Sequence, residues 1–479
     1  MKHKSIGINA LLNGFCGLTK IIFPLITFPY ISRILGVENV GLYNFSTSLV
    51  NYFSLIAALG ITTYAVREGA HYKNYIDDFS SEVFSINVCS TIFSYILLIV
   101  LLNINAKLYE SRFLTLLLSA KIFFDLIGIE WVYIIYEDFF YITLRTLLIQ
   151  TVSIIMIFLF VRTERDIYIY AFISVATASI SGIFNWFHAK KYGNLRFVLK
   201  KSMKKHIVSI LIIFFTTITV SVYSTSDITI LGFLCGNYTV GLYSVSAKIY
   251  NIVKSTLASV IIVSVPKIAE LCGNKNQVEL EKILTKIYKI LISVTFPAII
   301  GIIFLRKDII LLVSGKEYMG ASVSLALLAI AMIFNVCAWF WGQCVLIPFG
   351  HEKSALNSAI ITVIVNIALN FLLIPAWGLN AAAITTIVAE FISLILQKRT
   401  GEKLIAITGI SMIFFKTLIG SVFMGGVLLS ISYYIENIFL RIILSVFAGA
   451  AVYLGVESVL KNKELIDEAK KLIQERLHI

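Results

Sequence analysis

Residues 33–47 read RILGVENVGLYNFST, and residues 229–248 read TILGFLCGNYTVGLYSVSAK. Both stretches contain Leu-Gly, a short loop and the pattern V-G-L-Y-x-x-S, although the second loop is four residues longer. A four-letter match arises easily by chance, but the longer pattern at matching positions in two halves favours an internal duplication. The repeat therefore predicts that the chain consists of two related halves.

The composition indicates an all-α polytopic membrane protein. Hydrophobic residues make up 58% of the chain, charged residues 14%, and the mean hydropathy is +0.90. Soluble domains are roughly 45 to 50% apolar and about 25% charged. Apolar runs of about 20 residues, the length that crosses ~30 Å of hydrocarbon as a helix, recur along the chain. The first run is too long for a signal peptide and lacks a cleavage site, so we expect it to remain as a span.

Apolar runs of this length predict about fourteen transmembrane helices, among them spans near 42–66, 113–135, 355–375 and 380–397. Because six is an even number, a duplicated six-helix unit re-enters the membrane from the same side and yields two parallel, pseudo-symmetric bundles. Such bundles enclose a central cavity, the architecture of an alternating-access transporter. The chain is predicted to begin with a six-helix bundle (1–190), a basic linker (191–206) and a second six-helix bundle (207–397). Two additional helices (398–460) and an amphipathic tail (461–479) follow.

Basic residues predict the orientation of the chain. They concentrate in one set of loops, most densely over Lys190–Lys205, so the positive-inside rule places both termini in the cytoplasm. The net charge of +13 then reflects inside loops that face an anionic leaflet. The sequence lacks the interleaved aromatic and basic residues of a nucleic-acid groove, so the lipid bilayer is the expected partner.

Charges within the apolar runs predict a substrate site, because a charge at mid-bilayer costs about 2.5 to 3.5 kcal/mol. Lys20 shares a face of the first span with Asn13, Pro24 and Thr27. Lys248 shares a face of the eighth span with Asn251. Lys254 lies about 120° from Lys248 around the same helix, so at most one of them points straight into a cavity. This excess of cations favours an anionic substrate such as a diphosphate.

Other charged residues in apolar runs have two interpretations. Arg145, Lys121 and Lys416 either face the cavity or extend to water from span ends, while Asp125 and Glu130 are further candidates. The acidic residues Asp227 and Glu390 either carry a coupling proton or sodium ion, or form structural ion pairs.

Several motifs are missing from the sequence. It has no Walker A motif, no H-E-x-x-H and no G-x-S-x-G, and its six cysteines show no C-x-x-C spacing. We therefore expect no cofactor, no metal and no enzymatic activity, and a driving force that comes from an ion or substrate gradient.

Four segments resemble the polysaccharide biosynthesis flippases, the Wzx-type O-antigen transporters of the multidrug/oligosaccharidyl-lipid/polysaccharide exporter superfamily. They are FPYISRILGVENVGLYNF (28–45), GITTYAVREGA (60–70), VSVPKIAEL (263–271) and NIALNFLLIPAWGLNAAAITTIVAE (366–390), and the resemblance runs from about residue 5 to about residue 460. It implies a MATE-like fold in the bacterial inner membrane that moves undecaprenyl-diphosphate-linked oligosaccharide to the periplasmic leaflet. It further implies a polysaccharide polymerase and a chain-length regulator as partners, and an inner gate at Arg67 and Glu68.

Three alternatives compete with this interpretation. A drug or organic-cation antiporter of the same fold would need a cavity dominated by acids, and a lipid II or teichoic-chain flippase is not separable by motif. A membrane polysaccharide polymerase or ligase is disfavoured, because it would need a long external loop with catalytic residues.

Overall fold

The computed structural model describes residues 6–69, 76–193, 195–273 and 277–462, and it leaves out most side chains before Ile22. Every regular element within these ranges is a helix, which confirms the predicted all-α class. The predicted side-chain positions of Lys20 and Asn13, and almost all of the predicted tail 461–479, lie outside this description.

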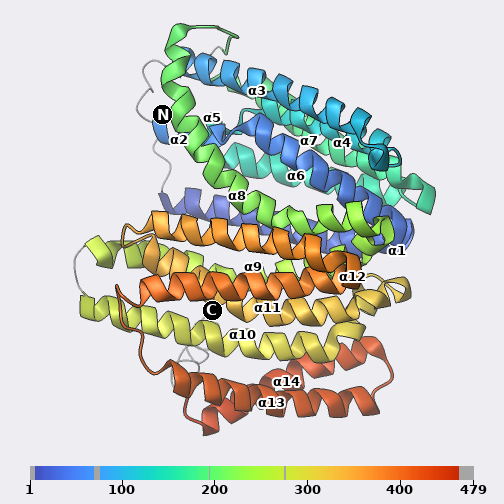
Figure 1. Cartoon of the computed structure of the whole chain (residues 1–479), viewed down its shortest axis with the longest axis vertical. Helices are drawn as coiled ribbons and strands as arrows, with labels where there is room; N and C mark the ends of the chain where they lie inside the picture. Colours follow the sequence, from blue (N-terminus) through green and yellow to red (C-terminus); the bar gives the residue numbers. More distant parts are fainter. Residues whose placement is uncertain (1–5, 70–75, 194, 274–276, 463–479) are drawn as a thin grey trace. The chain divides into compact units, whose positions relative to one another are not determined.

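The chain divides into two compact units, which we call unit 1 (Met1–Gly241) and unit 2 (Leu242–Ile479). The boundaries predicted from the duplication, at residues 190 and 207, stay a prediction, because these units are defined by compactness alone. Unit 1 contains eight complete helices (Figure 1): α1 (Ile6–Ala58), α2 (Ile61–Gly69), α3 (Ile76–Ile104), α4 (Arg112–Gly128), α5 (Glu130–Ile135), α6 (Phe139–Phe160), α7 (Ile167–Ala189) and α8 (Lys204–Cys235). The following helices are α9 (Asn237–Gly273), which begins in unit 1, α10 (Gln277–Val313), α11 (Ser322–Phe340), α12 (Glu352–Gly401), α13 (Ile410–Tyr434) and α14 (Ile438–Val459).

Ten helices of the described chain, or eleven if the bent α8 counts as one span, are long and apolar enough to cross a membrane. Two of them hold more than one predicted span. A continuous helix of the 50 residues of α12 would be about 75 Å long, more than twice the ~30 Å of a hydrocarbon core. Instead α12 breaks at Gly378, and Thr385 Oγ1 donates to Asn370 Oδ1, so the chain folds back on itself. The exact count of fourteen spans stays a prediction.

Two predicted spans are interrupted in the structure. The span predicted near 42–66 ends at Ala58, because Leu59 and Gly60 both have positive φ (47° and 71°) before α2 begins. The span predicted near 113–135 is divided into α4 and α5 by Ile129, which has φ 32°. Neither break carries a proline, so the periodicity of the apolar residues did not reveal them.

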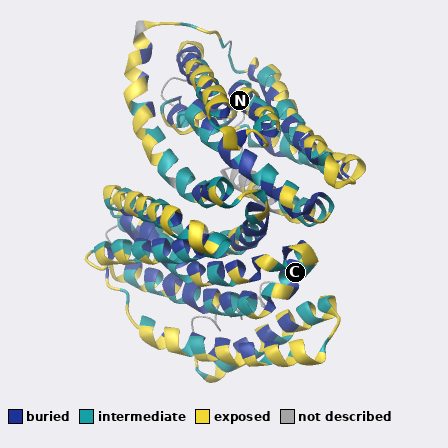
Figure 2. Cartoon of the chain, turned by 45° about the vertical axis from the view of Figure 1, so that its right-hand side comes forward, coloured by how far each residue is buried: buried dark blue, intermediate teal, exposed yellow. Residues whose placement is uncertain are grey.

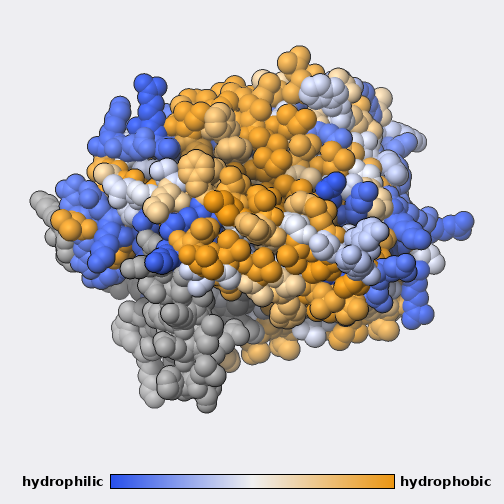
Figure 3. All heavy atoms as spheres, turned by 90° about the horizontal axis from the view of Figure 1, so that it is seen from below, coloured by the Kyte–Doolittle hydropathy of each residue, from blue (hydrophilic) through white to orange (hydrophobic). Residues whose placement is uncertain are grey.

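The outer faces of the helices are apolar. Large hydrophobic side chains such as Phe172, Phe215, Leu372 and Phe447 are more than half exposed, and exposed residues follow the outward sides of the helices in Figure 2. The face shown in Figure 3 is largely hydrophobic, with hydrophilic residues gathered at its two ends. This distribution suits a lipid environment, because hydrocarbon rather than water covers the exposed apolar side chains.

The two copies of the repeated motif have the same local conformation. Gly36 lies four residues before Val40 and has φ 73° and ψ 172°, whereas Gly236 lies four residues before Val240 and has φ 84° and ψ 176°. A positive φ with an extended ψ is a conformation that essentially only glycine adopts. The residue equivalent to Gly36 is therefore Gly236, and the expectation of equivalent Leu-Gly pairs separated by loops of different length was wrong.

The motif glycines also explain why the sequence repeats. A Cβ atom on Gly41 would lie 1.8 Å from the carbonyl oxygen of Asn237, and a Cβ atom on Gly241 would lie 2.1 Å from the carbonyl oxygen of Val37. The contact is reciprocal. Gly41 of the first copy faces the residue that follows the break at Gly236, and Gly241 of the second copy faces the residue that follows the break at Gly36. Only a residue without a side chain allows two helix backbones to approach this closely.

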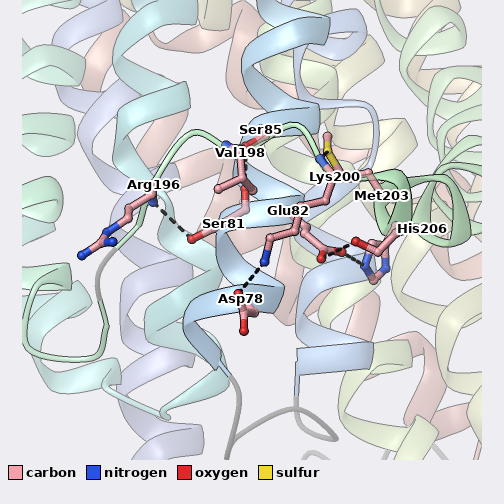
Figure 4. A network of polar contacts seen from close by, with 10 residues as sticks. Asp78, Ser81, Glu82, Ser85, Arg196, Val198, Lys200, Met203 and His206 are labelled. Atoms are coloured by element: carbon pink, nitrogen blue, oxygen red, sulfur yellow. Dashed lines mark hydrogen bonds and ion pairs between the residues drawn. The ribbon is translucent and has the colours of Figure 1, made fainter.

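The basic linker is bound to α3 over residues 195–203, a segment that we call the strap (Figure 4). Arg196, Val198 and Lys200 alternate along the strap and contact α3, whereas Ser202 lies in the 3₁₀ helix Lys201–Met203 that follows. Arg196 N donates to Ser81 Oγ (3.2 Å), and Val198 N donates to Ser85 Oγ (2.8 Å). The other two contacts join side chains: Lys200 Nζ to Asp78 Oδ1 (2.7 Å), and Ser202 Oγ to Glu82 Oε1 (2.7 Å).

These α3 residues, from Asp78 to Ser85, occupy positions i, i+3, i+4 and i+7 and so share one helix face. Just beyond the strap, His206 Nε2 lies 3.0 Å from Glu82 Oε2, and both side chains are buried. The Asp78 carboxylate raises the pKa of Lys200 through a hydrogen bond and charge attraction. Part of the positive charge that the sequence assigned to the membrane surface is therefore paired within the protein.

Candidate functional site

A cavity of about 1010 Å³ lies within unit 1. It is at the upper end of the range of about 300 to 1,000 Å³ that is usual for small-molecule sites. Residues from α1 to α7 and from the second half of α8 form its wall. The first helix contributes Pro24 and Thr27, which belong to the polar face that the sequence predicted around Lys20.

Among the described residues, four charged side chains line the cavity, two of each sign. Lys121 and Asp125 lie four residues apart on α4 and therefore share one face of that helix. Glu130 begins α5, and Arg145 comes from α6. All four were named as candidates from the sequence, and the structure brings them to one wall.

Arg145 is held in place by Asn185 of α7. The Arg145 guanidinium donates through Nη1 to Asn185 Oδ1, and its Nη2 lies 3.8 Å from Glu130 Oε1. The Arg145 side chain is only 9% exposed, whereas Glu130 is 49% exposed. The geometry fixes one buried cation of the wall by bonds to two neighbouring helices.

The same asparagine also completes the end of α4. Asn185 Nδ2 donates to the carbonyl oxygen of Gly128 at 2.7 Å, and the Tyr133 hydroxyl donates to the Asn185 carbonyl. The last carbonyl groups of a helix have no partner within the helix, so a buried helix end needs such an external donor. Asn185 thus joins α4, α6 and α7 at the cavity.

An aromatic and polar cluster continues from Arg145 to the segment after α7. The guanidinium lies 5.8 Å from the centre of the Tyr141 ring, which stacks on His188 at 3.9 Å. Asp138 accepts a hydrogen bond from the Tyr192 hydroxyl (2.7 Å) and lies 3.2 Å from His188 Nε2. Burial, and then the Asp138 carboxylate, raise the pKa of Tyr192, so this hydroxyl remains a donor at physiological pH.

We expect Asn185→Ala to destabilise the protein by about 1 to 3 kcal/mol, because it leaves the buried Gly128 carbonyl without its donor and removes the Asn185 acceptor of the Arg145 guanidinium. Thermal unfolding of the purified protein in detergent measures this change. Ser179→Ala on the same helix is the matched control, because Ser179 bonds only to the carbonyl of Val175 within its own turn. Equal unfolding temperatures for Asn185→Ala and wild type would contradict the assigned role of Asn185.

The predicted cationic residues of the second half lie on α9, in unit 2. Lys248 and Lys254 are half-buried and Asn251 is exposed. Lys254 Nζ lies 5.0 Å from the centre of the Tyr250 ring. Their predicted role in binding a diphosphate together with Lys20 and Asn13 stays a prediction.

The predicted coupling and gate residues do not line the cavity of unit 1. Asp227 is half-buried on α8, and Glu390 is buried on α12, where Asn335 Nδ2 donates to it at 2.7 Å. Arg67 and Glu68 pair with each other at 3.0 Å near the end of α2 and are 58% and 32% exposed. Their proposed functions remain predictions.

Four amide side chains of the wall were missed as site residues by sequence reasoning: Asn51, Asn87, Gln150 and Asn185. Each lies inside an apolar run, where an amide is costly without hydrogen bonds. Attention to charge alone overlooked this signal.

Two family models match the chain. The model described as polysaccharide biosynthesis protein matches residues 6–272, and the MatE model matches residues 212–372. Together the two matches extend from α1 into α12, and the cavity of unit 1 lies within the first of them.

Two curated relatives and one solved structure are similar to the chain. A protein of Escherichia coli (strain K12) whose name describes an O-antigen transporter is 25% identical over 257 residues, which cover 52% of this chain and 62%, less than two thirds, of that relative. The capsular polysaccharide biosynthesis protein CapF of Staphylococcus aureus is 23% identical over 383 residues, or 78% of this chain and 93% of CapF. A structure of the lipid II flippase MurJ in an inward closed conformation matches with a TM-score of 0.74 and 17% identity, over 94% of this chain and 98% of that chain, which shows a shared fold.

Proposed function

The chain belongs to the polysaccharide biosynthesis protein family and is a multi-pass membrane transporter of the multidrug/oligosaccharidyl-lipid/polysaccharide exporter superfamily, and we propose that it flips a lipid-linked oligosaccharide across the membrane. The proposed substrate is an undecaprenyl-diphosphate-linked repeat unit of an O-antigen, capsule or exopolysaccharide. The names of the E. coli and S. aureus relatives support this class of cargo. The proposed direction is from the cytoplasmic to the periplasmic leaflet.

The observation that carries the proposal is the polar cavity of unit 1. It combines a volume of about 1010 Å³ with charged, amide and hydroxyl side chains, inside a unit whose outer faces are apolar. Ionisable residues within membrane helices are costly and mark a substrate or ion path. A water-soluble headgroup needs such an enclosed polar path, because its hydroxyls and charges lose their hydration in hydrocarbon.

The charges of the cavity disfavour the organic-cation antiporter. Such a transporter needs a net negative cavity, whereas Asp125 and Glu130 are balanced here by Lys121 and Arg145. A lipid II or teichoic-chain flippase would carry a related lipid-linked cargo and is an alternative outcome of the test below.

The remaining parts of the proposal follow the positive-inside rule and the family resemblance. We place the protein in the bacterial inner membrane with both termini in the cytoplasm. A proton or sodium gradient is the proposed energy source, and a polysaccharide polymerase and a chain-length regulator are the proposed partners.

The proposal is tested in a producing strain that lacks the protein, by measuring how much lipid-linked oligosaccharide remains on the cytoplasmic leaflet. We expect the wild-type gene to clear this pool and Arg145→Ala to reduce clearance by about tenfold or more. Arg145 holds Asn185 and Glu130 in the wall of the cavity, and its removal disorders that wall. Hydrogen bonds to a charged group contribute about 1.5 to 3 kcal/mol, and 1.4 kcal/mol corresponds to a factor of ten.

Arg162→Ala is the matched control, because this arginine follows the other end of α6, outside the cavity. We expect it to transport at the wild-type rate when its membrane level is equal. If lipid-linked oligosaccharide reaches the periplasm normally in cells that lack the protein, the proposed function is wrong. If lipid II accumulates instead, the cargo is the peptidoglycan precursor.

A further inference from the structure

We infer that the cavity of unit 1 binds the sugar portion of the substrate and not its diphosphate, with Lys121 and Asp125 contacting sugar hydroxyls. This inference rests on the proposed function and assigns one chemical part of the cargo to one site. It follows from the signs of the charges, from their spacing on α4 and from the hydrogen-bonding capacity of the wall.

The balance of charge argues against a diphosphate site. Lys121 and Asp125 are one turn apart, so an anion that approaches the ammonium group also approaches the carboxylate. Attraction and repulsion of similar strength then nearly cancel. Arg145, the other cation among the described lining residues, is already bonded to Asn185 and lies near Glu130, and its side chain is only 9% exposed.

The exposed charged groups of α4 are available to a ligand. Lys121 and Asp125 both line the cavity and are exposed, and among the described residues neither forms a hydrogen bond or an ion pair within 4 Å. An ammonium group only donates hydrogen bonds, and a carboxylate only accepts them. A ligand that satisfies both groups must therefore accept and donate at neighbouring atoms.

A sugar hydroxyl meets this requirement, because it donates one hydrogen bond and accepts others, whereas phosphate oxygens only accept. The rest of the wall has the same dual capacity. Amides such as Asn51 and Asn87 offer both donors and acceptors, as do the hydroxyls of Ser54, Thr62, Ser181 and Ser224. Trp131 adds an aromatic side chain to the same wall.

The test measures binding to the purified full-length protein in nanodiscs by calorimetry, with two probes. One is the free oligosaccharide released by mild acid from the lipid-linked precursor of the producing strain, and the other is farnesyl diphosphate, which carries no sugar. We expect Asp125→Asn to weaken oligosaccharide binding by about tenfold, because a neutral amide oxygen replaces the charged acceptor and accepts a weaker hydrogen bond, and to leave farnesyl diphosphate binding within twofold.

A diphosphate site would respond in the opposite direction. Asp125→Asn would then tighten farnesyl diphosphate binding by removing a repulsive charge, and Lys121→Gln would weaken it; either result overturns the inference. Competition on the wild type needs no variant. Simultaneous binding of both probes supports separate sites for the sugar and the diphosphate. Displacement of the oligosaccharide by farnesyl diphosphate would overturn the inference.

The transport assay separates this inference from the proposed function. If the wild type clears the lipid-linked oligosaccharide while Asp125→Asn leaves oligosaccharide affinity unchanged, only the assignment of the cavity is wrong. If cells without the protein clear the lipid-linked oligosaccharide normally, the proposed function itself is wrong, whatever the binding results are.

Discussion

Replacing Gly41 by alanine is expected to destabilise the protein by at least the upper part of the range of about 1 to 3 kcal/mol that is typical of overpacked sites. The added Cβ atom would lie 1.8 Å from the carbonyl oxygen of Asn237, which is backbone and has no alternative rotamer. Gly241→Ala should have a similar effect, since its Cβ would lie 2.1 Å from the Val37 carbonyl oxygen. Thermal unfolding in detergent and the amount of folded protein in membranes measure both changes.

Gly426→Ala on α13 is the control with the opposite expected sign. No heavy atom lies within 4 Å of a Cβ atom at this exposed helical position. Alanine is favoured over glycine by about 0.5 to 1 kcal/mol in a helix interior, so we expect a small gain in stability. If Gly41→Ala unfolds at the wild-type temperature, the close crossing of the two motif copies is not a feature of the folded protein.

Glu82→Ala is expected to release the strap and to cost about 3 kcal/mol or more. The buried carboxylate accepts from Ser202 Oγ and lies 3.0 Å from His206 Nε2, and hydrogen bonds to charged groups contribute about 1.5 to 3 kcal/mol each. Its removal also leaves His206 without this acceptor in a buried site. Trypsin cleavage after the basic residues of the strap, such as Arg196 and Lys200, reports the release directly.

Asp78→Ala, one turn earlier on α3, is the matched control (Figure 4). It removes the pair with Lys200, but those side chains are 71% and 46% exposed. Exposed ion pairs contribute little, so we expect no measurable change in unfolding temperature or in trypsin cleavage. Equal cleavage rates for Asp78→Ala and Glu82→Ala would show that Glu82 does not hold the strap in place.

The sequence predicted the membrane class, the helical fold and the family because these depend on local properties. Runs of about 20 apolar residues select helices in lipid wherever they occur, since hydrocarbon offers no partner for backbone polar groups. The repeat around Val40 and Val240 also lies in the sequence itself, and it marked the place where the two copies cross.

Sequence reasoning was less successful where helices end or break. The break at Ile129 carries no proline, and the terminal carbonyl of the preceding Gly128 is satisfied by Asn185, which is distant in the sequence. The equivalence of Gly36 and Gly236 became clear only from their dihedral angles, because Gly36 belongs to a Leu-Gly pair whereas Gly236 lies four residues after one.

The sequence by itself determined that charged residues lie inside apolar runs, and its composition and spacing predicted an all-helical membrane protein. Only the tertiary structure decided that Lys121, Asp125, Glu130 and Arg145 share one wall, on which the described residues carry equal numbers of each sign. Helical periodicity fixes which residues share a face, but it does not fix what that face contacts. That contact depends on helices far apart in the chain, as Asn185 shows by joining the end of α4 to Arg145 of α6.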